Sequence, residues 1–203
     1  TMKSAKAETK TLAITSPIAD SGAAVSFVAG TAVAANSNIT GTGPVVADGS
    51  ATSTITIMLI DIFSNPIVGT VPTFSATDTG TTNINSICTS SNASGVSTCT
   101  MTSTNAETKT LSIVAPIADT GGTVTYTVGA PSAVTSTITG TGPVIANNSS
   151  TSAVTITLLD AFSNPISGTI PTFDATDTGG GNGYSVCTSS NASGVSTCTL
   201  LSN

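Results

Sequence analysis

Apolar and polar residues alternate along much of the chain with a period of two. The alternation is clear at residues 54–59, 124–128 and 154–158. Successive side chains of a β-strand point to opposite faces, so this pattern predicts strands with one face in a core and the other in solvent. Short segments rich in Gly, Asn, Asp and Pro interrupt the pattern at residues 41–44, 64–66, 78–80, 92–95 and 119–122. No segment between them shows the length and 3.6-residue apolar spacing of a helix, which predicts an all-β protein.

The sequence also repeats itself after 99 residues. Aligned at this shift without a gap, residues 31–104 match residues 130–203 at 48 of 74 positions. Residues 1–30 match residues 100–129 at 17 of 30 positions. Self-similarity at one fixed period is the signature of a repeat architecture. We therefore expect the chain to be part of a tandem array.

The spacing of the turn signals predicts about seven strands in each repeat, the number found in an immunoglobulin-like sandwich. The expected strands, A to G, are residues 36–48 (interrupted at 43–44), 51–61, 70–77, 85–91, 95–103, 107–114 and 123–129. The predicted fold is thus a series of tandem Ig-like β-sandwiches. Residues 1–30 would supply the end of strand E and strands F and G of a preceding unit. Residues 31–129 would form a complete unit, and residues 130–203 a unit that stops after strand E.

Composition excludes several functions. The chain has four lysines, ten carboxylates and no histidine or arginine, and charged residues are 7% of the total. It therefore lacks an imidazole base and a guanidinium group for phosphate, so we expect no enzyme and no catalytic residues. A net charge of -6 argues against a nucleic-acid partner. No apolar run has the length of a membrane helix, and the positive mean hydropathy argues against disorder.

Three motifs resemble a known family. Residues 57–67 form an apolar strand that ends in Asp, followed by a turn that closes on Asn-Pro-Ile; residues 72–78 read PTFSATD, and residues 92–98 read NASGVST. This order is similar to that of the bacterial Ig-like group 1 domains, the tandem modules of intimin and invasin stalks. Ser64 stands where a turn Gly is usual and Asn92 where Asp is usual, and paired cysteines are not typical. The resemblance implies an extracellular rod, spacer or adhesin stalk, with no cofactor and no catalytic residues to transfer.

The cysteines predict one disulfide in each repeat. Folding the predicted D–E hairpin about residues 92–95 places Cys88 directly opposite Cys99, and the same geometry applies to Cys187 and Cys198. Directly opposite positions of an antiparallel pair have the separation that a disulfide needs. Closing so short a loop should stabilise the fold by about 3 kcal/mol in the chain-entropy model. A redox switch, an intermolecular link and reduced buried thiols are the alternatives.

Three pairs of carboxylates and one pair of lysines recur at the repeat period. Asp20/Asp119, Asp61/Asp160 and Asp78/Asp177 each lie beside turn residues, where Asp binds neighbouring backbone amides. Calcium at the repeat junctions is the alternative, but one carboxylate per loop is a thin supply of ligands, so we expect no metal. Lys10 and Lys109 lie in phase with core residues of strand F. An intramolecular isopeptide bond is conceivable there, against the simpler alternative of a lysine that extends to water.

The chain contains five N-glycosylation motifs, and such motifs also arise by chance in a chain so rich in Ser and Thr. The candidate sites are Asn38, Asn92, Asn147, Asn148 and Asn191.

These observations favour a structural module of an extracellular fibre or adhesin stalk at the cell surface, whose partners are further copies of itself. Near-identical repeats suit a mechanical role better than recognition. One alternative is a module that binds a receptor or glycan, for which the difference between residues 81–85 and 180–184 gives weak support. A second concerns assembly: the N-terminal F and G strands could complete the sheets of a neighbouring subunit, as in donor-strand pili, instead of belonging to a longer covalent array.

Overall fold

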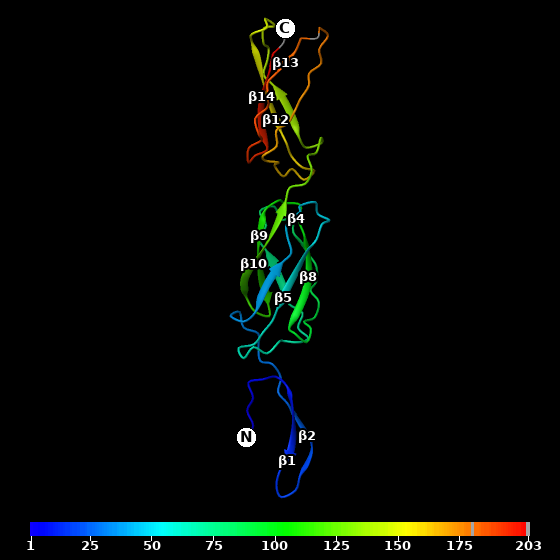
Figure 1. Cartoon of the computed structure of the whole chain (residues 1–203), viewed down its shortest axis with the longest axis vertical. Coiled ribbons are helices and arrows are strands. Elements are labelled where there is room, and N and C mark those ends of the chain that lie inside the picture. Colours follow the sequence, from blue (N-terminus) through cyan, green and yellow to red (C-terminus); the bar gives the residue numbers. More distant parts are fainter. Residues whose placement is uncertain (180, 202–203) are drawn as a thin grey trace. The chain divides into compact units, whose positions relative to one another are not determined.

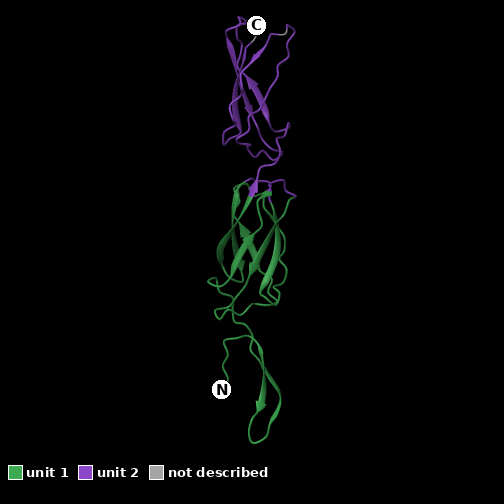
Figure 2. Cartoon of the chain, in the orientation of Figure 1, with its two compact units in different colours: residues 1–45, 51–102, 107–125 green, residues 46–50, 103–106, 126–203 purple. Residues whose placement is uncertain are grey.

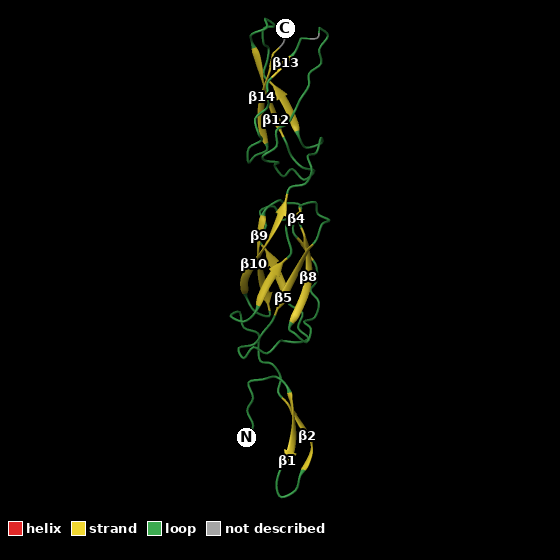
Figure 3. Cartoon of the chain, viewed as in Figure 1, coloured by secondary structure: helices red, strands yellow, loops and turns green. Residues whose placement is uncertain are grey.

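The computed structural model describes residues 1–179 and 181–201; Gly180, Ser202 and Asn203 lie outside the described residues. Strands and loops make up the described chain, with no helix among them, and so no helix that could cross a membrane (Figure 3). The all-β prediction is confirmed. The chain divides into two compact units (Figure 2). Unit 1 comprises residues 1–45, 51–102 and 107–125, and unit 2 comprises residues 46–50, 103–106 and 126–203.

Residues 1–30 contain a single antiparallel hairpin within unit 1. Its strands are β1 (Thr9–Ile14) and β2 (Asp20–Ser26), and they form a two-stranded sheet with one irregularity of register between Thr11 and Ala13. At the 99-residue shift these strands correspond to strands F and G of the next repeat. That this hairpin supplies strands F and G of a preceding unit stays a prediction.

Residues 31–129 form two four-stranded sheets (Figure 1). The first has the order β3-β5-β8-β7 and the second β4-β10-β9-β6, which correspond to A-B-E-D and A′-G-F-C of an Ig-like sandwich. The strands are β3 (Asn38–Gly41), β4 (Val45–Val46), β5 (Ser53–Met58), β6 (Thr73–Ala76), β7 (Ile84–Asn85), β8 (Val96–Thr102), β9 (Thr108–Ala115) and β10 (Asp119–Thr127).

Alternate residues of the central strands are buried, as the period of two predicts. Ile55 and Ile57 of β5 and Met101 of β8 are buried on one sheet, and Leu111 and Ile113 of β9 on the other. Strand D is shorter than expected. It is a regular strand only at β7, although the backbone N–H groups of residues 86 and 89 still donate to β8.

Residues 130–201 form one four-stranded sheet with the order β11-β12-β14-β13. Its strands are β11 (Thr137–Gly140), β12 (Thr151–Thr157), β13 (Gly183–Tyr184) and β14 (Val195–Leu201). Val154, Ile156 and the two cysteines form its buried cluster, against which Phe173 packs.

The sequence predicts a strand C here as well, and that expectation is wrong, since residues 171–177 form no strand. The middle repeat shows the reason: β6 is hydrogen-bonded only to β9 within its sheet. The described part of residues 130–201 has no strand equivalent to β9. The backbone of strand C therefore lacks its pairing partner.

Candidate functional site: a repeated Asp–Asn network

A buried carboxylate organises the turn that follows β5. Asp61 Oδ1 accepts backbone hydrogen bonds from Phe63 and Asn65, both at 2.8 Å. Its Oδ2 accepts from the backbone N–H of Gly30 and from Asn65 Nδ2, both at 2.9 Å. Ser64 adopts a φ of 64° in this turn, the left-handed region in which Gly is the usual residue. Asp61 thus satisfies donors from its own turn and from residue 30, the segment that follows β2.

Asn65 extends the network to the segment that precedes β1. Its Oδ1 accepts a hydrogen bond from the backbone N–H of Ala7, and its Nδ2 donates to the carbonyl of Ala5, each at 2.8 Å. Asn65 is buried. Its side-chain amide accepts one hydrogen bond and donates another, as the backbone of a neighbouring β-strand would. Within unit 1, one side chain joins the start of the sandwich to the loop before the hairpin.

Unit 2 contains the same network, atom for atom. Asp160 occupies the place of Asp61 and Asn164 the place of Asn65, and both are buried. The partner groups come from Thr104, Ala106, Gly129 and Phe162, with donor–acceptor distances between 2.8 and 2.9 Å. Ser163 has a φ of 67°, like Ser64. Every partner is the residue expected from the 99-residue period.

The network keeps its carboxylates ionised. Burial raises the pKa of Asp61, but the hydrogen bonds donated by Asn65, Gly30 and Phe63 outweigh it and lower the pKa from 3.8 to about 2. In unit 2, burial acts on Asp160 in the same direction, and the donors led by the Gly129 backbone N–H lower its pKa below the ordinary value. Both side chains are therefore hydrogen-bond acceptors at neutral pH, facing N–H donors.

Sequence reasoning found half of this site. The prediction that Asp61 and Asp160 bind turn amides agrees with the structure. The partnership of Asn65 and Asn164 with residues about 60 positions away was missed, because hydrogen bonds of that span leave no mark in local spacing. The available signal was the recurrence of an unchanged Phe-Ser-Asn-Pro-Ile segment at residues 63–67 and 162–166.

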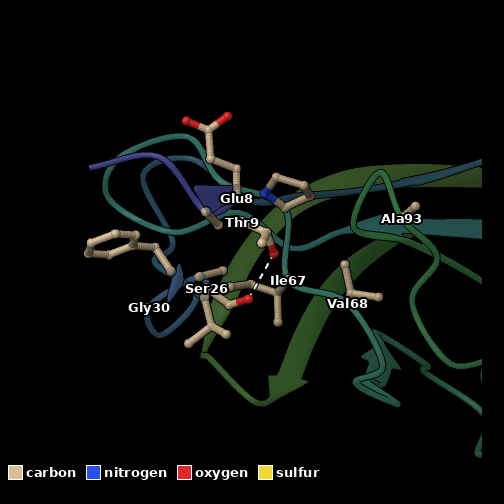
Figure 4. A pocket seen from close by; sticks show the side chains of 12 residues that line it. Glu8, Thr9, Ser26, Gly30, Ile67, Val68 and Ala93 are labelled. Carbon is tan, nitrogen blue, oxygen red and sulfur yellow. Dashed lines mark hydrogen bonds between the residues drawn. The ribbon is translucent and has the colours of Figure 1, made fainter. Parts of the chain in front are cut away.

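An open groove lies beside the network in unit 1. It has a volume of about 560 Å³ and is lined by the base of the hairpin and by residues 66–68 (Figure 4). Thr9 and Ser26 are hydrogen-bonded to each other on the hairpin side, while Ile67 and Val68 lie on the sandwich side. The one ionisable side chain on its lining is Glu8. This composition offers shape and backbone groups but no set of residues for catalysis.

Each of the two Ig-like repeats also has one disulfide. It joins the segment after β7 to β8 in the first repeat and the segment after β13 to β14 in the second. Cys88 is bonded to Cys99, and Cys187 to Cys198, with Cα–Cα distances of 4.3 and 4.4 Å. All four cysteines are buried. The sulfurs therefore lie in the core, as the phase of the strands predicts.

Comparison with known proteins gives structural neighbours only. No protein-family model and no curated protein matches the chain. Invasin, a bacterial integrin-binding protein, superposes with a TM-score of 0.65 at 24% identity over 93% of this chain and 38% of its own. FdeC, an Escherichia coli adhesin, superposes with a TM-score of 0.63 at 22% identity, over 96% of this chain and 65% of its own. InvD of Yersinia pseudotuberculosis superposes with a TM-score of 0.57 at 26% identity, over 84% of this chain and 50% of its own. The chain has the fold of bacterial Ig-like adhesin domains.

The chain spans less than two thirds of each of these neighbours. What it shares with them is the Ig-like fold.

The asparagines of the glycosylation motifs lie on the surface of the Ig-like domains. All five asparagines of the glycosylation motifs are exposed. Three of them hold turns through their side-chain oxygens, which accept backbone hydrogen bonds: Asn92, Asn147 and Asn191. Glycosylation stays a prediction. Among the described residues, no group of three or more His, Cys, Asp or Glu side chains is placed to hold a metal ion.

The loop that differs most between the two Ig-like domains carries an anchored tyrosine. Tyr184 packs edge-on against Phe173, with ring centroids 5.3 Å apart. Its hydroxyl donates to Asp174 Oδ1 at 2.9 Å. Residue 180 of this loop lies outside the described residues.

Proposed function

We propose that the chain is a structural repeat module of an extracellular fibre or adhesin stalk, in which Ig-like domains follow one another end to end. The observation that carries the proposal is the Asp–Asn network, which occurs twice with the same atoms. If residues 31–129 and their 99-residue neighbours are the domains, each network joins the loop before strand F of one domain to the turn after strand B of the next. A device repeated at every junction suits an element that must transmit force along its length.

Equivalent apolar residues of the repeats differ in exposure. Ile14 of the hairpin is 48% exposed, whereas its equivalent in the middle repeat, Ile113, is 1% exposed. Ile138 is 55% exposed, and its equivalent Ile39 is 2% exposed. The partners we propose are copies of the same repeat. The disulfides favour an oxidising compartment such as the cell surface.

We propose a longer covalent array in preference to strand donation between subunits. Gly129, which donates to Asp160, lies on the continuous chain that leaves β10, and Gly30 lies at the same place after β2. The network thus includes a residue of the polypeptide link itself. In strand donation, the F–G hairpin of one subunit would instead complete its neighbour.

The mass of the chain in native fibres decides between the two assemblies. Fibres are dissolved in denaturant with reductant, and the intact mass of their chain is measured. The covalent array predicts a species far heavier than the 19.7 kDa of residues 1–203. A chain of that smaller mass would overturn the covalent array and leave strand donation. Cryo-electron microscopy of the same fibres tests the function: a continuous filament with a one- or two-domain axial repeat supports it. Single rods that end in a distinct head would make these domains spacers.

A receptor-binding module is the second candidate, favoured by one observation. Tyr184 is partly exposed on the most divergent loop, where the preceding repeat has Asn85. Tyrosine is enriched at interfaces. However, the ring contact with Phe173 already gives Tyr184 a structural role. Replacing Tyr184 with Phe, which keeps the ring, should leave attachment of cells to immobilised protein unchanged. A loss of attachment would favour the binding module.

A further inference from the structure

Lys109 is a fully buried charged residue that is not part of the Asp–Asn network. It lies on β9, and its side chain is 0% exposed. The expectation that this lysine extends to water is therefore wrong. Its equivalent in the hairpin, Lys10, has a side chain that is 38% exposed. Burial of a lysine without compensation is costly, so the groups around Lys109 Nζ define what this position does.

Two carboxylates face Lys109 Nζ. Glu107 Oε1 lies 2.7 Å away, and Asp78 Oδ1 lies 3.3 Å away. Glu107 is on the segment that leads into β9, whereas Asp78 is in the turn after β6, 31 residues from Lys109. All three residues belong to unit 1.

The contacts of the two carboxylates differ in a way that assigns them different roles. Asp78 Oδ2 accepts backbone hydrogen bonds from Asn83 at 2.7 Å and from Thr82. These donors polarise the Asp78 carboxyl group and would stabilise negative charge on Oδ2, as in an oxyanion hole. Glu107 accepts hydrogen bonds from the backbone N–H and the hydroxyl of Thr79, and its Oε1 is the carboxylate oxygen nearer to Lys109 Nζ, a position suited to moving protons.

We propose that Lys109 and Asp78 form an intramolecular isopeptide bond, with Glu107 relaying protons. Glu107 accepts a proton from Lys109 Nζ and passes it to Asp78 Oδ1, and the neutral amine attacks Cγ of the protonated carboxyl group while Oδ2 carries the negative charge; a second proton then moves from Nζ to Oδ1. The bond between Cγ and Oδ1 then breaks, and Oδ1 leaves as water with two hydrogens that both originate from Nζ. An ammonium and a carboxylate become an amide and a water molecule. Glu107 returns to its starting state, and no oxidant, reductant or co-reactant is consumed.

Two features of the site favour this reaction. Holding amine and carboxyl in contact converts a bimolecular condensation into an intramolecular one, which is worth several orders of magnitude in rate. The full burial of Nζ also keeps water from competing with it. The bond would encircle the disulfide of the same repeat, because Cys88 and Cys99 both lie between residues 78 and 109. It does not depend on the proposed role in a fibre.

The lysine distribution provides a sharp test. Lys109 is the only lysine or arginine after residue 10, so trypsin has one cleavage site in the remaining chain. With free Lys109, the reduced and denatured protein should give two large fragments, residues 11–109 and 110–203. With the amide in place, trypsin should leave residues 11–203 whole, and the reduced intact mass should be one water molecule below the sequence mass. Fragmentation of a peptic digest should yield a branched peptide that contains Asp78 and Lys109.

Variants and outcomes follow from the assigned roles. Lys109→Met, which keeps an apolar stem, and Glu107→Gln should both show the full sequence mass. Of the two variants, only Glu107→Gln keeps a tryptic site after residue 10, and trypsin should cut it after residue 109. The wild-type protein alone can overturn the proposal if its mass is that of the sequence and trypsin cuts it. A branched peptide that joins Lys109 to Glu107 would also overturn it.

Discussion

At the scale of single residues, the protein uses its few charges as hydrogen-bond centres. Asp61 and Asp160 each satisfy four N–H donors, and Asn65 and Asn164 carry the network into the preceding segment. The sequence predicted the aspartates because Asp beside turn residues has a local physical role. It did not predict the asparagine contacts or the burial of Lys109, because both depend on which distant segments the fold brings together.

Removing Asn164 should weaken unit 2. Asn164→Ala deletes the bonds to Thr104 and Ala106 and leaves partly buried backbone groups without these partners, which should cost about 1–3 kcal/mol of unfolding free energy. Differential scanning calorimetry would show the loss in the transition of unit 2. Asn38→Ala is the matched control, since Asn38 is exposed, and it should change neither transition. Equal melting curves for both variants would mean that the network contributes no stability.

The network should survive moderate acid. The folded pKa of Asp61 is about 2 and its ordinary value is 3.8, so its contribution to stability is complete above the ordinary value. That contribution is lost as the pH falls from about 3.8 toward 2. The difference in melting temperature between wild type and Asp61→Asn should be constant from pH 7 to pH 5. It should shrink below pH 4. A difference that already shrinks near pH 6 would contradict the lowered pKa.

At the scale of elements, alternation and turn residues predicted most strands, and strand C of residues 130–201 is the clearest failure. The central strands β5, β8 and β9 have buried residues at every second position, and these were found with small errors at their ends. Residues 171–177 have the same sequence pattern as the segment that contains β6 but form no strand. A strand exists only where a neighbour pairs with it, and pairing is a property of the sheet that local pattern does not contain.

The disulfide should carry much of the stability of the D–E segment. Strand D is regular only over β7, so the cross-link from Cys88 to Cys99 holds a segment with few ladder bonds. Reduction should lower the unfolding free energy of unit 1 by about 3 kcal/mol. Calorimetry with and without a phosphine reductant measures this. In the double variant Cys88→Ala with Cys99→Ala, unit 1 should melt at the temperature found for the reduced wild-type protein. Adding the reductant should not change this transition.

At the scale of the whole molecule, the 99-residue period explains why equivalent residues differ in exposure. Ile39 and Ile138 have the same place in the repeat, yet only Ile39 is covered. The difference follows from their surroundings, because residues 31–129 contain β9 and β10 and the described part of residues 130–201 contains no equivalent pair. Self-comparison of the sequence predicts that residues 130–203 stop after strand E of their repeat, and this division stays a prediction.

Supplying the missing pair should complete the second sandwich. We would extend the chain after Asn203 with a copy of residues 105–129, which continues the repeat in frame. The added strands should pair with residues 171–177 and cover Ile138 and Phe173. Burying each large apolar side chain is worth about 1.5–3 kcal/mol, so the transition of unit 2 should rise by several degrees. Amides of residues 171–177 should also gain protection from hydrogen exchange.

The control for this extension keeps its length and removes its apolar face. The same copy with Asp at the positions of Leu111 and Ile113 preserves the turn chemistry but places two carboxylates where the core should close. Burial of such unpaired charges is prohibitive, so this version should leave the melting of unit 2 unchanged. Equal stabilisation by both extensions would mean that chain length alone acts. No stabilisation by the native copy would contradict the reading of residues 130–203 as strands A to E of an Ig-like repeat.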